Sequence, residues 1–188
     1  MIEIQILGRG GQGVVSAAYL IASSAFKQGL IAQASAEIGI ERRGSPVSSF
    51  VRISKTPITR YDHIYQPDIL VVQDSTLLQT NPEKNLKKNG ILIVNSKKSL
   101  NELNLRKDIK VFTINATDLT INIFGKPFFN VPLMAALASL TKIISLNSIY
   151  EAIEEIWYDK PKEIIEKNKL VSQKAFDMFN KIKCKVKL

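Results

Sequence analysis

The glycine-rich stretch Gly8-Arg9-Gly10-Gly11-Gln12-Gly13 lies between an apolar segment, Ile2–Leu7, and a segment of small and apolar residues, Val14–Leu20. The first segment has the composition of a buried strand and the second that of a helix, so the glycines are expected to form the turn between them. Glycine lets the backbone adopt positive φ and lets another group approach closely. The unpaired N–H groups at the start of the following helix favour an anion there.

The glycines at positions 8, 10 and 13 fit the G-x-G-x-x-G pattern of a Rossmann-like turn between a strand and a helix. A dinucleotide site also needs a carboxylate at the end of the next strand, about 20 residues further on, to bind the ribose. That strand is expected near Leu30–Ser35, where Gln33 and Ser35 occupy the relevant positions. The turn is therefore predicted to bind a phosphate or another anion, with a turn that serves packing alone as the alternative. A free-standing NAD(P)-binding protein is disfavoured.

A second polar segment, Glu41-Arg42-Arg43-Gly44-Ser45-Pro46-Val47, precedes a strand of alternating exposure that is predicted over Val47–Ser54. Two adjacent guanidinium groups beside a glycine suit bidentate binding of a phosphate or a carboxylate. The alternative is that Arg42 and Arg43 pair with neighbouring glutamates at the surface, where ion pairs contribute little to stability. The sequence leaves both interpretations open.

Strands and helices alternate along the rest of the chain. Three short apolar runs are expected to be strands buried on both faces, namely Ile69–Val72, Ile91–Val94 and Val111–Ile114. A helix is expected to begin at Ala116, and the chain beyond Pro132 is expected to be helical, with an apolar run over Leu133–Ile144. This order predicts an α/β fold with an open, mostly parallel sheet flanked by helices and a helical C-terminal arm. Residues 1–188 are expected to form a single domain.

The apolar run Val131–Ala138 is too hydrophobic for an exposed helix. It is either the central core helix or a subunit contact, and the core is favoured. Asn130 precedes the run and is expected to cap the helix, with ligand binding as the alternative. Because Phe128 and Phe129 add large apolar side chains, we also expect part of the segment Phe128–Leu137 to lie in a subunit interface.

Composition disfavours several classes of protein. The net charge is +9, but the basic residues are spread along the chain and alternate with acidic ones, which disfavours a nucleic-acid-binding protein. The single cysteine, Cys184, cannot supply the thiolates of an iron–sulfur cluster, and the single histidine, His63, is expected at the surface without a metal or catalytic role. The apolar runs are too short to cross a membrane and no export signal is seen, so a cytoplasmic location is expected.

Taken together, these segments resemble the gamma subunits of the 2-oxoacid:ferredoxin oxidoreductases, the family that includes pyruvate:ferredoxin oxidoreductase. Two positions depart from the family pattern, since Ala135 stands where glycine is frequent and Gln73 stands where a hydrophobic residue is more usual. The resemblance extends over nearly the whole chain and rests on the order and spacing of the blocks Gly8–Gly13, Glu41–Val47, Val51–Ser54, Gln66–Asp74, Asn89–Asn95, Ala116–Asp118, Phe129–Leu137 and Lys167–Asn168.

The resemblance implies a gamma subunit of a heteromeric enzyme, most similar to the pyruvate enzyme, that decarboxylates a 2-oxoacid, reduces ferredoxin and transfers the acyl group to coenzyme A. It implies partner subunits of alpha, beta and delta type, which carry the thiamine diphosphate, Mg²⁺ and iron–sulfur clusters, and no catalytic residue on this chain. A purely structural gamma subunit is the alternative. Because coenzyme A is an anion, its expected contacts here are Gly8, Arg9, Gly10, Gly11, Gln12, Gly13, Arg42, Arg43 and Asn130.

Overall fold

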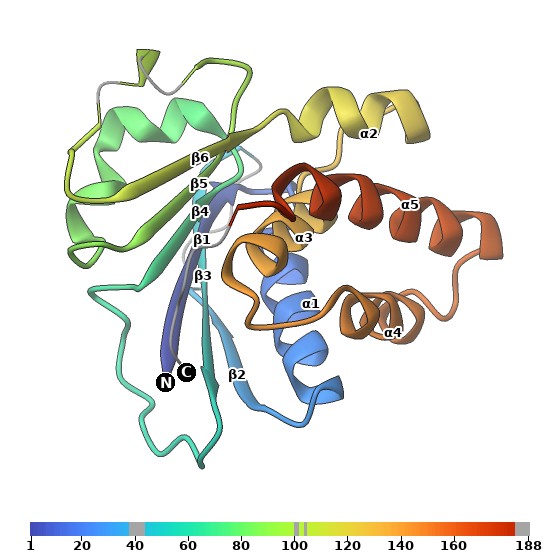
Figure 1. Cartoon of the computed structure of the whole chain (residues 1–188), viewed down its shortest axis with the longest axis horizontal. Helices are drawn as coiled ribbons and strands as arrows, with labels where there is room; N and C mark the ends of the chain where they lie inside the picture. Colours follow the sequence, from blue (N-terminus) through green and yellow to red (C-terminus); the bar gives the residue numbers. More distant parts are fainter. Residues whose placement is uncertain (38–43, 100–101, 104, 183–188) are drawn as a thin grey trace.

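The computed structural model describes residues 1–37, 44–99, 102–103 and 105–182. These residues form a six-stranded sheet in the order β2-β3-β1-β4-β5-β6, with helices packed against it (Figure 1). The strands are β1 (Ile2–Arg9), β2 (Ile31–Ala36), β3 (Pro46–Ser54), β4 (Ile69–Val72), β5 (Ile91–Asn95) and β6 (Lys110–Ile114). The helices are α1 (Val14–Lys27), α2 (Ala116–Phe124), α3 (Asn130–Thr141), α4 (Leu146–Ile156) and α5 (Lys162–Phe179), and two short 3-10 helices, η1 (Ser75–Thr80) and η2 (Pro82–Asn85), follow β4.

The sheet is mostly parallel, as predicted. Strands β1, β4, β5 and β6 pair in parallel, whereas β3 runs antiparallel to both of its neighbours, β1 and β2. Because β3 lies between β1 and β2, these two strands are separated by two strand spacings, or about 10 Å. In a dinucleotide-binding fold the ribose carboxylate follows the strand next to the glycine turn. A ribose-binding carboxylate at the end of β2 would therefore lie away from the glycine turn, and this topology disfavours an NAD(P) site.

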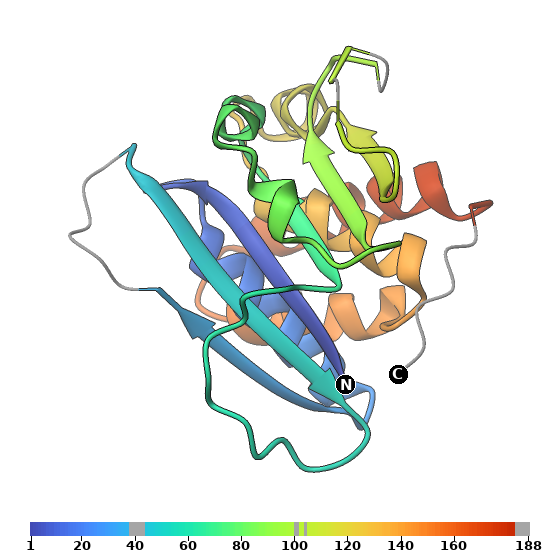
Figure 2. The same ribbon diagram turned by 90° about the vertical axis from the view of Figure 1, so that its left-hand side faces the viewer.

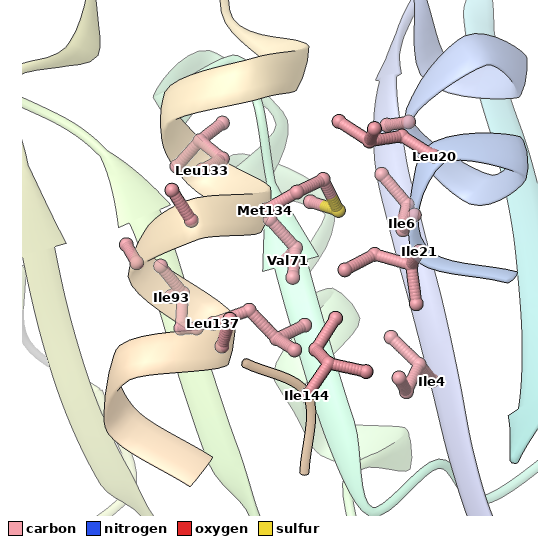
Figure 3. Close-up of a cluster of buried hydrophobic side chains, with 14 of the residues drawn as sticks. Ile4, Ile6, Leu20, Ile21, Val71, Ile93, Leu133, Met134, Leu137 and Ile144 are labelled. Carbon is pink, nitrogen blue, oxygen red and sulfur yellow. The ribbon is translucent and has the colours of Figure 1, made fainter. Parts of the chain in front are cut away.

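Both faces of the central strands are buried, which is why their sequences are continuous apolar runs. Helices α1, α3, α4 and α5 lie on one side of the sheet in Figure 1. Figure 3 shows the cluster on this side, where Ile4, Ile6, Val71 and Ile93 of the strands meet side chains of α1 and α3. The side chains that alternate with these point to the opposite face, and they form a smaller cluster with residues of the η1–η2 segment: Leu7, Leu70, Val72, Leu77, Leu86, Leu92 and Val94.

Helix α3 is the central core helix of this chain. All of its residues from Val131 to Thr141 are buried within the chain itself, between the sheet and α5. The favoured interpretation of the apolar run is confirmed. The expectation that part of Phe128–Leu137 lies in a subunit interface is wrong for Val131–Leu137, because the chain itself already covers these residues, and it stays a prediction for Phe128 and Phe129. Phe128 keeps 37% of its surface exposed. The helix ends at Thr141, before the predicted Ile144, because Lys142 adopts a left-handed conformation with φ 58.

Strand β3 is buried from Ser49 to Ser54, so the predicted alternation of exposed and buried residues along it is wrong. Helix α1 covers one face of β3, and the segment 55–65 covers part of the other. The side chain of Arg52 fastens this segment to the sheet, because its guanidinium donates to the carbonyl of Asp62 at 2.6 Å and to Glu3 Oε1 at 3.2 Å. A charged residue in a strand thus occupies a buried position, where it is 4% exposed.

Candidate ligand-binding site

A cleft of about 250 Å³ opens at the carboxyl ends of the four parallel strands. The chain leaves β1 and β4 in opposite directions along the sheet, and in α/β folds such a reversal of strand order produces a crevice that binds ligands. The residues that line it follow one or another of these strands or precede α3, and they are almost all polar: Gln12, Gln73, Asp74, Ser75, Asn95, Ser96, Lys97, Asn115, Thr117 and Phe129.

Gln12 of the glycine turn lines one wall of this cleft, and the local geometry favours glycine at three positions of the turn. A Cβ atom at Gly8 would lie 2.6 Å from Cγ2 of Val14, closer than packed atoms approach, and 3.0 Å from Oε1 of Gln73, so that both neighbouring side chains would have to shift. Gly11 has φ 92, and Gly13, which directly precedes α1, has φ 75; a positive φ of this kind strains residues with a side chain. The predicted strand, turn and helix are therefore confirmed.

Much of the hydrogen-bonding capacity of the turn is used inside the chain. The N–H of Gly10 donates to the carbonyl of Ser45 at 2.8 Å, and the N–H of Gly44 donates to the carbonyl of Gly10 at 3.2 Å. The Arg9 guanidinium donates to Asp74 Oδ2 at 3.0 Å and also to the carbonyl of Gly44 and the hydroxyl of Thr76. In this structure Arg9 thus joins the turn to the segment that precedes β3 and to the segment that follows β4.

Gln12 and Asp74 complete the hydrogen-bond network that holds the glycine turn. Gln12 accepts from the N–H of Arg9 at 2.7 Å and donates to Asp74 Oδ2 at 3.2 Å, so its side chain bridges the turn and the β4 end. Burial of Asp74 opposes its ionisation, but hydrogen bonds from Thr76 and Gln12, together with the charge of Arg9, outweigh this effect. They hold the pKa of Asp74 below its ordinary value. The carboxylate therefore stays ionised and keeps the turn in place.

Three helices begin beside the cleft. α1 starts after Gly13, α2 starts after Asn115, and α3 starts after Phe129. The side chain of Asn115 caps α2 by accepting from the N–H of Asp118 at 3.1 Å, whereas α1 and α3 have no side-chain cap. Because uncapped N–H groups carry the positive end of the helix dipole, this arrangement favours an anion.

Asn130 does not cap α3, so that prediction is wrong. It is the first residue of the helix, and the preceding position belongs to Phe129. Its side chain instead lies against the glycine turn, because a Cβ atom at Gly13 would be 3.2 Å from Nδ2 of Asn130. The structure thus brings together Asn130 and the residues from Gly8 to Gly13, two sets that are more than 100 positions apart in the sequence.

Gln73 is the main feature of the cleft that sequence reasoning did not assign. Its side chain is fully buried, and neither its Nε2 nor its Oε1 atom has a hydrogen-bond partner among the described residues. Such a group is costly unless something binds it. Asn95, in contrast, is satisfied, because its Nδ2 donates to the carbonyl of Gln73 at 3.0 Å and its Oδ1 accepts from the N–H of Ala116 at 3.1 Å.

A signal for these residues was present in the sequence. Gln73 directly follows the apolar run of β4, Asn95 ends β5 and Asn115 directly follows β6. Carboxyl ends of parallel strands meet at one edge of a sheet, so polar residues at those ends are expected to lie close together. The pattern could have predicted this wall of the cleft.

The other candidate residues of the sequence are placed differently. Arg42 and Arg43 lie outside the described residues, although Gly44 and Ser45, which follow them, are bonded to the glycine turn. His63 is exposed, with its ring centroid 4.7 Å from that of Phe50. Across the described residues, no group of three or more His, Cys, Asp or Glu side chains is arranged to hold a metal ion. In the same part of the chain, no helix has the length and apolar character needed to span a membrane.

Comparison with known proteins assigns the chain to a family. A family model for pyruvate ferredoxin/flavodoxin oxidoreductases matches residues 3–178. The chain belongs to this family. The common gamma subunit of the pyruvate and ketoisovalerate oxidoreductases of Thermococcus kodakarensis is 41% identical over 181 residues, which cover 94% of this chain and 96% of the relative. Pyruvate synthase subunit PorC of Methanocaldococcus jannaschii is 40% identical over 178 residues, with coverage of 94% and 96%.

A solved structure gives the same assignment. The crystal structure of pyruvate oxidoreductase subunit PORC from Thermotoga maritima superimposes with a TM-score of 0.81 at 32% identity, and the match covers 94% of this chain and 95% of the other. The predicted family is therefore confirmed. The chain is a gamma subunit of a 2-oxoacid:ferredoxin oxidoreductase, a multi-subunit oxidoreductase, and it is similar to the gamma subunits of pyruvate enzymes.

Proposed function

We propose that this gamma subunit serves a pyruvate:ferredoxin oxidoreductase and helps to bind coenzyme A at the cleft described above. The phosphates of coenzyme A are placed at the N-termini of α1 and α3, next to Gly13 and Asn130. The residues from Gly8 to Gln12 shape the turn, and Arg42 and Arg43 add positive charge. The thiamine diphosphate, Mg²⁺ and iron–sulfur clusters belong to alpha-, beta- and delta-type partners in a cytoplasmic complex that reduces ferredoxin.

The observation that carries this proposal is the buried amide of Gln73. It lies beside the glycine turn, with its Oε1 atom 3.0 Å from the position of a Cβ atom at Gly8, and it has no partner among the described residues. An amide that offers both a donor and an acceptor suits a ligand that also carries both kinds of group, and coenzyme A has amides, hydroxyls and phosphates. Gln73 and the two uncapped helix ends together fit such a ligand.

The alternative is a structural gamma subunit whose glycine turn serves packing alone. One observation favours it: the turn is already bonded to Ser45, Gly44 and Asp74 within the chain. In this case Gln73 would be an unsatisfied amide without a role in binding. The two functions therefore predict different consequences of removing that amide.

The experiment is the substitution Gln73→Leu in the assembled complex, with coenzyme A binding measured by calorimetry. Leucine has a similar volume, and it removes a buried polar group that lacks a partner, so the midpoint of thermal unfolding should stay the same or rise. Loss of one hydrogen bond, worth about 1 kcal/mol, should weaken coenzyme A binding about fivefold. The KM for the 2-oxoacid should not change.

Ser49→Ala is the matched control. Ser49 is fully buried on β3, its hydroxyl also lacks a partner among the described residues, and it does not line the cleft. Its replacement should leave coenzyme A binding unchanged. If Gln73→Leu also leaves the affinity for coenzyme A unchanged in a stable complex, Gln73 has no role in binding and the structural alternative is favoured.

A further inference from the structure

Strand β2 is an edge of the sheet without the usual protection. It pairs with β3 residue by residue, from Ile31 opposite Ser54 to Ala36 opposite Ser49, and no strand of the described residues pairs with its outer side (Figure 2). Natural edge strands are usually blunted by charged residues, proline or a bulge, because an open edge pairs readily with another chain. The sequence of β2, Ile-Ala-Gln-Ala-Ser-Ala, contains no charge and no proline. The opposite edge strand, β6, begins with Lys110.

The side of α1 next to β2 continues this uncharged surface. Tyr19 and Phe26 are 58% and 73% exposed, and with Ala22 they are spaced three and four residues apart, so they form one stripe along the helix. Phe26 lies close to β2, because it lines a hollow of about 430 Å³ together with Gly29, Leu30, Ile31 and Ala32. We call the outer edge of β2 and this stripe the β2–α1 surface.

The geometry of the two layers fits a second copy of the same chain. When two identical edges pair in an antiparallel manner, the twofold axis is perpendicular to the sheet, so both α1 helices lie on the same face. Helix α1 packs across β2 and β3 and also contacts β1, so it is set back from the edge by about half to one strand spacing. With strands about 4.8 Å apart, the two α1 axes would lie about 10 to 14 Å apart, a separation at which the large side chains of Tyr19 and Phe26 can meet between the helices.

We propose that two copies of this gamma subunit pair through the β2–α1 surface, so that their sheets join and their Tyr19 and Phe26 stripes meet. A strand from another protein would use the open edge of β2 but would leave the apolar stripe of α1 without a partner. A second copy of the chain explains both features, because its own β2 pairs with the edge and its own α1 meets the stripe. The chain has a net charge of +9, and an uncharged strip is where two such chains can meet without placing like charges opposite each other.

Single-cysteine cross-linking tests this pairing directly. Cys184 is the only cysteine of the chain, so Cys184→Ser gives a cysteine-free background. One residue of β2 lies at the twofold axis and faces its own copy with Cα atoms about 5 Å apart, which is within the range of a disulfide. Each β2 position is replaced by cysteine in turn, and the full chain and the purified complex are oxidised mildly. We expect disulfide-linked gamma dimers from the position at the axis.

Met178→Cys is the control, because Met178 is 57% exposed and lies next to Phe179, whose ring contacts Phe112 of β6 at the opposite edge of the sheet. It should not cross-link. Phe26→Asp should raise the dimer dissociation constant at least tenfold, measured by analytical ultracentrifugation, while Met178→Asp leaves it unchanged. The free chain has its own buried core, and circular dichroism verifies that each variant is folded. If no β2 cysteine forms a gamma dimer in either the free chain or the complex, the proposal is wrong.

Discussion

Replacement of Gly13 by alanine separates backbone strain from the function of the glycine turn. Gly13 has φ 75, and a Cβ atom there would lie 3.2 Å from Nδ2 of Asn130. Gly29 is a matched control, because it has φ 78 and a Cβ atom there would meet nothing within 4 Å. The left-handed conformation costs a residue with a side chain about 1 to 2 kcal/mol. Alanine also lowers the conformational entropy of the unfolded chain relative to glycine, which offsets about 0.4 to 1 kcal/mol of this cost.

Both substitutions should therefore lower the free energy of unfolding by roughly 1 kcal/mol, measured by urea denaturation of the full chain. Gly13→Ala should lower the free energy of unfolding more than Gly29→Ala does, because the new methyl group at position 13 contacts Asn130 too closely. Removal of that amide by Asn130→Ala should abolish the extra loss, which a double-mutant cycle reports as a coupling energy. The cycle thus measures the contact between the turn and α3.

The functional consequence should be confined to Gly13. Displacement of the N-terminus of α1 by the new methyl group removes a hydrogen bond to a charged phosphate, worth about 1.5 kcal/mol, and should weaken coenzyme A binding to the complex about tenfold. Gly29→Ala, at the other end of α1, should leave this affinity unchanged. Equal affinities in the two variants would refute the assignment of coenzyme A to this turn.

Three further predictions concern the fold that positions the site. Arg52→Met should lower the free energy of unfolding by about 3 kcal/mol, because Glu3 would stay buried with Lys87 as its remaining ion-pair partner among the described residues. The control is Arg60→Met, at an exposed arginine, which should change this free energy by less than about 0.5 kcal/mol. Equal losses of stability in the two variants would contradict the buried role of Arg52. The pKa of Asp74 is lower in the folded than in the unfolded chain. Its carboxylate therefore contributes fully to stability above the unfolded pKa of about 3.9, and this contribution is lost as the pH falls through the folded pKa. In Asp74→Asn, urea denaturation at a series of acidic pH values should lack this loss of stability. Amides from Val131 to Leu140 should exchange hydrogen equally slowly in the free subunit and in the complex, because α3 is buried in its own chain, and faster exchange in the free subunit would restore the interface interpretation.

Local patterns in the sequence predicted the elements but not which elements become neighbours. The apolar runs at Ile69–Val72 and Ile91–Val94 predicted buried strands within one residue of their ends, because a strand covered on both faces must be apolar throughout. The position of β3 between β1 and β2 was not predictable in the same way. Pairing between distant strands is decided by the packing of the whole sheet, and the alternation expected for β3 failed because the segment 55–65 covers it.

Site residues were predictable where backbone conformation restricts the residue type. Gly8 and Gly13 were identified because a close approach and a left-handed φ both favour glycine, and both conditions are present in the structure. Asn130 was assigned to a cap because asparagine before an apolar run usually has that role. Its contact with Gly13 joins two segments that only the tertiary fold brings together, so no local pattern could have predicted it.

The departure of Gln73 from the family pattern has a physical meaning that the sequence alone did not give. A hydrophobic side chain at this position would fill the same space beside Gly8 without leaving polar atoms unpaired. The buried amide instead costs about 1 to 3 kcal/mol if it has no partner. Among the described residues, buried side-chain atoms without a partner occur on only two residues besides Gln73, namely Ser49 and Glu83, and of these three residues Gln73 alone lines the cleft where the turn and the helix ends meet. A ligand that reaches this amide after a shift of the neighbouring side chains would supply the missing hydrogen bonds, and this is why we propose coenzyme A at Gln73 and not elsewhere on the chain.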